Sequence, residues 1–278
     1  MAAEGSTGSM SNARTIDEVL DRLDSIIQSS IDSGSRIGYF AALYRMVTAQ
    51  VKEGIINGRF EDGPRMERLD VRFANRFLDA YDAYSRKEKC SLCWRIAFDA
   101  AERQEPLVLQ HLLLGMNAHI NYDLGIAAAD TCPGAALESL HHDFNVINDI
   151  LSSLIDEVKG DLDAVSPWIG WLDRLGGRAT DIIIRFSMEQ ARNFAWRFAV
   201  GLSQADSVDR FKLSMNKDAE STLLGQEILK PPGWLLRSAI WLIRLRESSS
   251  VADITRHLFN KSITTTPIPP QSGTVGVS

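Results

Sequence analysis

Hydrophobic side chains recur along this chain with the spacing of α-helices. The first helical segment runs up to Gly34, opens with Thr15 followed three residues later by Glu18, as is typical of a helix N-terminus, and repeats Ile16, Val19, Leu20, Leu23, Ile26 and Ile27. The same spacing predicts further helices at residues 37–52, 65–84, 90–103, 107–127, 134–158, 167–174, 178–202, 216–228 and 233–246. Alternating strand patterns are nearly absent. We therefore expect an all-α fold, a single multi-helix bundle.

The two ends of the chain differ from this pattern. Residues 1–12 are small and polar, and residues 261–278 are rich in Thr, Pro, Gly and Ser, so we expect two disordered tails around a helical domain at 13–260. Segment 160–167 is the best candidate for a break, but the apolar helices on either side indicate continued packing.

One apolar run, Trp234 to Leu245, is about 12 residues long and contains Arg237 and Arg244, so it is too short and too charged to span a bilayer. We interpret it as a core helix whose arginine stems reach solvent, with a membrane-surface helix as the alternative.

Composition excludes several classes of function. The 278 residues carry a net charge of -6 and no basic stripe, which argues against a nucleic-acid partner. The three cysteines cannot all pair within one chain, and the chain does not start with a signal-peptide pattern, so we expect a cytoplasmic protein. The lone pair Cys90 and Cys93 is interpreted as two helical thiols rather than a zinc or redox site. Motifs of zincin proteases, P-loop enzymes, Rossmann dehydrogenases and α/β-hydrolases are absent from the sequence.

The most informative segment is 107–126, because it is apolar enough to be buried and yet carries His111, Asn117, His119, Asn121 and Asp123. An unpaired buried amide or imidazole costs roughly 1–3 kcal/mol, so these groups need partners in the protein, water, a metal or a ligand. His111, Gly115, His119 and Asp123 lie on one ridge with a four-residue spacing, and Asp123 can fix the tautomer of His119.

A second polar set lies on the next predicted helix. His141, Asn145 and Asn148 share one face of that helix, and His142 lies on another. The short connection between the two helices favours antiparallel packing. We therefore expect a buried polar ridge on two adjacent helices that face a shared hollow. The alternative for each of these residues is a purely structural role, capping or cross-linking helices.

The stretch from Gln110 to Asp123, followed by His142, Asp143 and Phe144 and by Ile147 and Asn148, resembles a bacterial and fungal family of all-helical proteins of unknown function. The chain also looks like a protein of a fungal biosynthetic gene cluster. Some such proteins are cyclases for terpenoids and polyketides, as in the Diels-Alder-type, norbornene-forming step of sordarin-type pathways. The resemblance implies a shared fold more firmly than a shared reaction.

A further resemblance concerns magnesium. Asn148, Asp149 and Ser152, with Asp156 in place of a glutamate, are similar to the NDxxSxxxE motif of class I terpene cyclases. The companion DDxxD motif is missing, and Asp79 with Asp82 is the nearest equivalent. Without both halves the magnesium cluster of that family cannot assemble.

These observations lead to one leading hypothesis and two alternatives. The first is a cofactor-independent cyclase or isomerase that folds an apolar terpenoid-like or polyketide-like substrate in a helical cavity lined by aromatic residues. We expect no organic cofactor and no metal, with the site formed by His111, Asn117, His119, Asp123, His142, Asn145 and Asn148. The second is a divalent-metal hydrolase with His119, Asp123 and His142 as ligands. The third is a non-enzymatic protein that binds a small molecule.

Overall fold

The computed structural model describes residues 12–151, 188–245, 247 and 250–264, and within these ranges it has helices and no strand. The elements are α1 (Ile16–Ser33), α2 (Ile37–Ile56), α3 (Gly63–Ser85), α4 (Leu92–Ala101), α5 (Val108–Met116), the π-helix η1 (Asn117–Asp123), α6 (Leu124–Thr131), the 3-10 helix η2 (Gly134–Leu140), α10 (Met188–Gln204), α11 (Ser207–Leu229), α12 (Trp234–Arg244) and α13 (Val251–Thr264). Residues 141–151 are also helical. The expected all-α fold is confirmed.

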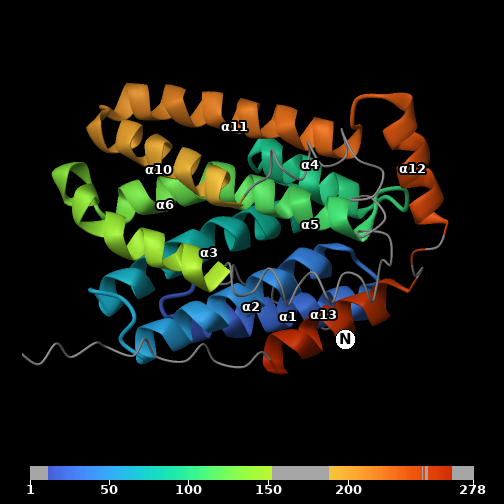
Figure 1. Cartoon of the computed structure of the whole chain (residues 1–278), viewed down its shortest axis with the longest axis horizontal. Helices are drawn as coiled ribbons and strands as arrows, with labels where there is room; N and C mark the ends of the chain where they lie inside the picture. The colour runs from blue at the N-terminus through green and yellow to red at the C-terminus, as the bar shows by residue number, and fades with distance from the viewer. Residues whose placement is uncertain (1–11, 152–187, 246, 248–249, 265–278) are drawn as a thin grey trace, which may run out of the picture.

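The segments α5, η1 and α6 follow one another as a single rod through the middle of the molecule (Figure 1). On one side of this rod, α1, α2 and α13 pack against one another, and α2 also contacts α5. On the other side, α10 packs against α6, and α11 contacts η1 and α4. The rod that carries the first predicted polar set is therefore covered on both sides by other helices.

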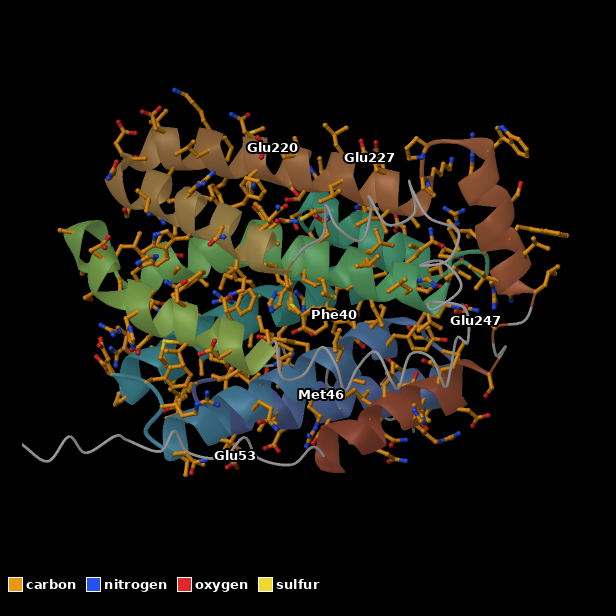
Figure 2. The ribbon with its side chains drawn as sticks, viewed as in Figure 1. Phe40, Met46, Glu53, Glu220, Glu227 and Glu247 are labelled. Carbon is orange, nitrogen blue, oxygen red and sulfur yellow. The ribbon has the colours of Figure 1, made fainter. Side chains whose placement is uncertain are left out.

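The interior is built from apolar side chains with the predicted helical spacing. Val19, Leu23 and Ile27 of α1 are completely buried, and the Thr15 side chain caps this helix by accepting from the Glu18 N–H, as predicted. Phe40 of α2 lies between the lower helices and the central rod (Figure 2). Burial of such side chains contributes roughly 1.5–3 kcal/mol each, which is the main source of the stability of the fold.

Several predicted boundaries differ from the structure. Helix α11 begins at Ser207 rather than at 216, because the Asp206 side chain accepts from the Val208 and Asp209 N–H groups and caps it there. Helix α13 was not predicted, and residues 261–264, expected in the tail, belong to it. The Ser250 hydroxyl caps α13 by accepting from the Asp253 N–H. Ile254 and Leu258 bury its apolar stripe against α1 and α2.

Other predictions fall on residues that the structure does not describe. These are the N-terminal tail up to residue 11, the C-terminal tail from residue 265 to 278, the helix at 167–174, the break at 160–167, and the predicted helical residues 152–158 and 178–187. The expected start of the helix at 134 is a 3-10 turn, and α-helix begins only after Leu140.

Candidate functional site

The π-helix η1 holds three of the predicted site residues, Asn117, His119 and Asp123. The Leu124 N–H donates to the His119 carbonyl five residues earlier, whereas an α-helix would use a partner four residues earlier. Such single π turns are frequent at functional sites. The sequence predicted a continuous helix here and carried no signal for the π turn.

Asp123 is the centre of a buried polar network. Its carboxylate is 1% exposed and accepts from the Trp94 indole N–H at 2.7 Å and from Arg76 Nε at 2.8 Å. His119 Nδ1 lies 3.3 Å from the same oxygen that Trp94 contacts. Because a carboxylate can only accept, Nδ1 carries the proton and Nε2 is the acceptor of the His119 ring. Asp123 therefore orients His119, as predicted, and also ties η1 to α3 and α4.

Aromatic rings enclose the His119 side chain. Phe73 stacks on it at a centroid distance of 3.6 Å, and the Tyr44 ring lies 4.4 Å away, edge-on. Phe40, Phe77 and Trp94 complete the enclosure. Burial lowers the pKa of His119 against the opposing effect of Asp123, so the ring is neutral. Nε2 is buried without a hydrogen-bond partner.

The amides of the rod attach it to α11. Asn117 Nδ2 donates to the Ser221 carbonyl at 2.7 Å, and Asn121 Nδ2 donates to Asn117 Oδ1 at 3.0 Å. Gln110 Nε2 donates to the Ile228 carbonyl at 2.7 Å, near the C-terminal end of α11. These contacts cross-link the central rod to α11, which is the structural role given as the alternative for these residues in the sequence analysis.

His111 lies in a different environment, on α5, six residues before η1 begins at Asn117. Its ring is 5% exposed, and neither nitrogen makes a hydrogen bond of normal geometry. Burial, together with the charges of Arg36 and Arg244, lowers the pKa of His111 to about 3, while the nearby Pro106 carbonyl acts in the opposite direction. The imidazole is therefore neutral at physiological pH.

Two small hollows meet at His111, and Arg36 lines both. The first has a volume of about 10 Å³, and its charged lining residues are Arg36, Arg244 and Glu247. The second has a volume of about 20 Å³ and is mostly apolar, with the aromatic residues Phe40, Phe77, Trp94 and Phe98 in its wall. Each hollow has room for about one water molecule.

The C-terminal helices complete the charged hollow. The Glu247 carboxylate accepts from the Val108 N–H at 3.2 Å and so caps α5, and Arg244 Nη1 lies 3.6 Å from the same group. Arg244 Nε also donates to the Gln104 carbonyl at 2.6 Å. Arg36 Nη1 donates to the Ala101 carbonyl at 3.4 Å. Sequence reasoning missed Arg36, Arg244 and Glu247, because only the packing of α2, α5 and α12 brings them together.

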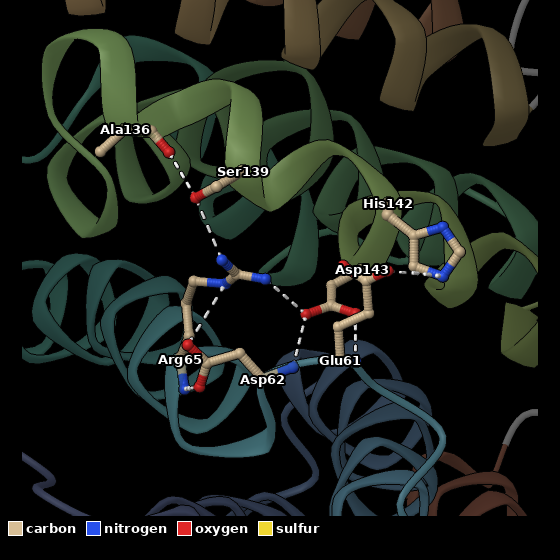
Figure 3. A network of polar contacts seen from close by, with 7 residues as sticks. All are labelled: Glu61, Asp62, Arg65, Ala136, Ser139, His142 and Asp143. Atoms are coloured by element: carbon tan, nitrogen blue, oxygen red, sulfur yellow. Dashed lines mark hydrogen bonds and ion pairs between the residues drawn. The ribbon is translucent and has the colours of Figure 1, made fainter.

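The second predicted polar set is not buried, which corrects the expected ridge on two adjacent helices. His141, His142 and Asn145 are exposed. His142 Nε2 lies 3.9 Å from Glu61 Oε1 at the surface (Figure 3). The helix turns Phe144, Ile147 and Ile150 toward the core, so its polar face points to solvent.

Asp143, next to His142, has a structural role that Figure 3 displays. It is completely buried and accepts from the Glu61 and Asp62 N–H groups at 2.7 and 3.1 Å and from Arg65 Nη2 at 2.8 Å. Burial alone would raise the pKa of this carboxyl, but these hydrogen bonds hold it below its usual range. Asp143 thus fixes the loop before α3 to the helix at 141–151.

Asn148 also lies apart from His119. Its Oδ1 accepts from Arg192 Nε of α10 at 2.5 Å, and the Arg192 guanidinium lies 4.3 Å above the Phe144 ring. Burial lowers the pKa of Arg192 to about 9. Asn148 is thus hydrogen-bonded to a cation, which disagrees with a role as a magnesium ligand; Ser152 and Asp156 of the same motif lie outside the described residues.

The shared hollow expected between two polar helices is therefore not formed in the described part of the chain. His119 is enclosed by aromatic rings, His111 lines two separate hollows, and His142 and Asn145 face solvent. The ligands proposed for the hydrolase are likewise not brought together, because His119 is buried and His142 pairs with Glu61 at the surface. Among the described residues, no group of three or more His, Cys, Asp or Glu side chains is arranged to hold a metal ion.

Comparison with known proteins places the chain in a family. No match is found among curated proteins or among solved structures. The model of a family of unknown function, DUF5995, matches residues 16–231, from the start of α1 to two residues beyond the end of α11. Because this match covers most of the sequence, the chain belongs to the family of unknown function DUF5995.

Proposed function

We propose that this protein binds an apolar small molecule with a carboxylate or carbonyl group at His111 and acts on it as a cofactor-independent cyclase or isomerase. The observation that carries the proposal is the buried His111 imidazole, whose nitrogens make no hydrogen bond of normal geometry and which lies where a charged hollow meets an apolar one. A pocket with apolar walls and a few convergent polar groups is typical of a small-molecule site.

The chemistry follows from the lining residues. A neutral imidazole donates a hydrogen bond to a carbonyl oxygen without adding a charge, and Arg36 with Arg244 attracts a carboxylate. The aromatic walls contact the apolar body of the substrate and hold it in a folded conformation. Effective molarities of well-oriented intramolecular reactions correspond to roughly 7–11 kcal/mol of barrier lowering, so orientation supplies much of the required rate.

The two hollows at His111 are too small for such a substrate unless the site opens. Hollows of about 10 and 20 Å³ do not hold a terpenoid-like or polyketide-like molecule, so Arg244 and Glu247 must move away from α5 when such a substrate enters. His119, Asp123 and Asn117 then act as positioning residues that hold the rod in place. His142, Asn145 and Asn148 lie outside this pocket.

The test compares metabolites of the producing organism with the gene intact, deleted, or carrying His111→Phe. A cyclisation or isomerisation leaves the molecular mass unchanged. We therefore expect the deletion to replace one apolar product by an isomer of equal mass, and His111→Phe to have the same effect while the protein stays folded. The matched control is His142→Phe, an exposed histidine outside the pocket, which should leave the products unchanged.

The alternatives predict different results. A hydrolase predicts a substrate and product that differ by the mass of water. A binding protein without activity predicts identical metabolite structures in all strains, while the purified protein still binds an anionic aromatic dye such as anilinonaphthalene sulfonate. If His111→Phe produced the wild-type products, the proposed site would be wrong.

A further inference from the structure

Helix α12 presents an apolar face to solvent. The side chains of Trp234, Trp241 and Leu245 are 71%, 62% and 63% exposed, and they fall within about 40° of one another around the helix. Leu242, which is 49% exposed, borders the same face. On the opposite side, Ile243 is buried against the body of the molecule. The expectation of a core helix is therefore wrong for this face.

The position of α12 leaves this face uncovered. The helix lies at one end of the molecule, beyond the end of α11 and across the direction of the central rod (Figure 1). Isolated exposed apolar residues are common on protein surfaces, but two tryptophans on one face of a helix are not. A face of this kind marks a surface that is covered when the protein functions.

The charges of α12 indicate which kind of partner covers its apolar face. The segment from Trp234 to Leu245 contains Arg237 and Arg244 and no acidic residue. Arg237 is exposed beside the tryptophan face, and its Nε donates to the Gly233 carbonyl at 3.4 Å. A second copy of α12 would bring the same positive edge to the contact, which is unfavourable. An anionic lipid surface attracts the arginine and accepts tryptophan rings at the level of the headgroups.

We propose that α12 is a membrane-surface helix that docks this protein on anionic bilayers. Trp234, Trp241 and Leu245 would enter the boundary between headgroups and acyl chains, roughly 5–10 Å deep, with Arg237 at the lipid phosphates. No helix among the described residues is long and apolar enough to cross a membrane. This inference depends on α12 alone and not on the function proposed for His111. The family match ends at residue 231, just before α12 begins.

The experiment is flotation of the full chain with vesicles of phosphatidylcholine, alone or mixed with phosphatidylserine. We expect binding to the mixed vesicles that weakens with added salt. The double variant Trp234→Ser, Trp241→Ser should bind at least about tenfold more weakly, because two large apolar side chains no longer enter the bilayer. Arg237→Gln should weaken binding to the mixed vesicles about fivefold and leave any binding to pure phosphatidylcholine unchanged.

The matched control is Phe211→Ser on α11, which removes a side chain that is 65% exposed on another helix and should not change vesicle binding. Thermal unfolding of each variant checks that it is folded. The proposal is overturned if the wild-type chain does not float with the mixed vesicles, or if Phe211→Ser weakens flotation as much as the double variant. A second copy of the chain could instead cover this face. Light scattering would then detect a dimer of the wild-type chain that the double variant abolishes, and this result without vesicle binding would also overturn the proposal.

Discussion

Three donors from three helices converge on Asp123. Trp94 comes from α4, Arg76 from α3 and His119 from η1, and the carboxylate they share is buried. The sequence predicted the His119–Asp123 pair from its four-residue spacing. Trp94 and Arg76 could not be predicted as its partners, because a tryptophan and an arginine far away in the sequence give no local sign that they meet a carboxylate.

Removing this acceptor leaves the Arg76 charge and two buried N–H groups without a partner. We expect Asp123→Ala to lower the free energy of unfolding by about 3 kcal/mol, measured by urea denaturation. Asp209→Ala is the control, because Asp209 pairs with Lys212 at the surface, and it should change stability by no more than about 0.5 kcal/mol. Equal effects of the two substitutions would contradict a central role of the Asp123 network.

At the scale of elements, the close approach of α5 to α2 depends on Gly115. A Cβ atom at this position would lie 2.4 Å from ring carbons of Phe40, which itself lies in a packed group of aromatic rings. The helical pattern of 107–127 placed Gly115 on the polar ridge with His111 and His119. The packing of α5 against α2, and not the sequence pattern, brings this ridge so close to α2 that a methyl group does not fit.

Gly115→Ala should therefore destabilise the protein by roughly 1–3 kcal/mol, because the Phe40 ring must shift in a close-packed core. Gly201→Ala on α10 is the matched control, since its added Cβ meets only Leu213 at 3.9 Å. There the higher helix propensity of alanine should stabilise the chain by about 0.5–1 kcal/mol. Thermal and urea unfolding of the two variants should thus shift in opposite directions, and a stabilised Gly115→Ala would show that the core has free space at this contact.

At the scale of the whole molecule, buried titratable groups couple stability to pH. Burial lowers the pKa of His111 to about 3, below its usual 6.5, so the unfolded chain binds a proton more readily. The contribution of His111 to the free energy of unfolding is therefore fully present above pH 6.5 and is lost as the pH falls toward 3. Burial raises the pKa of Asp70 from 3.8 to about 7, with a smaller effect of Glu67. Asp70 thus contributes in the opposite direction, and its contribution is lost as the pH rises through 7.

Urea unfolding at several pH values separates the two effects. His111→Phe should gain stability relative to the wild-type chain as the pH falls from 7 to 5, by up to about 1.4 kcal/mol for each pH unit. Asp70→Asn should gain relative to the wild-type chain as the pH rises from 5 to 8. If the difference in unfolding free energy between each variant and the wild type did not change with pH, the two groups would be solvated in the folded protein.

Much of the fold followed from local information in the sequence. Helical spacing and the Thr15 cap predicted α1, and the apolar positions of 37–52 and 65–84 predicted the bodies of α2 and α3. The segment Ser250 to Asp253 followed by Ile254 and Leu258 contained the signal for α13, which the sequence reading overlooked. In the site, the buried His111, Asn117, His119 and Asp123 were predicted from polar residues on an apolar helix.

The sequence by itself determined that the chain is helical, that residues 107–126 are buried, and that Asp123 can orient His119, because periodicity, capping and four-residue spacing act within one helix. Only the tertiary structure decided which polar groups meet. The residues around His142 have the same composition as a buried ridge, yet Phe144, Ile147 and Ile150 turn them to solvent. Arg36 and Arg244 reach His111 only because α2 and α12 pack near α5. The pairing of polar and charged side chains depends on helices that are distant in the sequence, so no local pattern encodes these contacts.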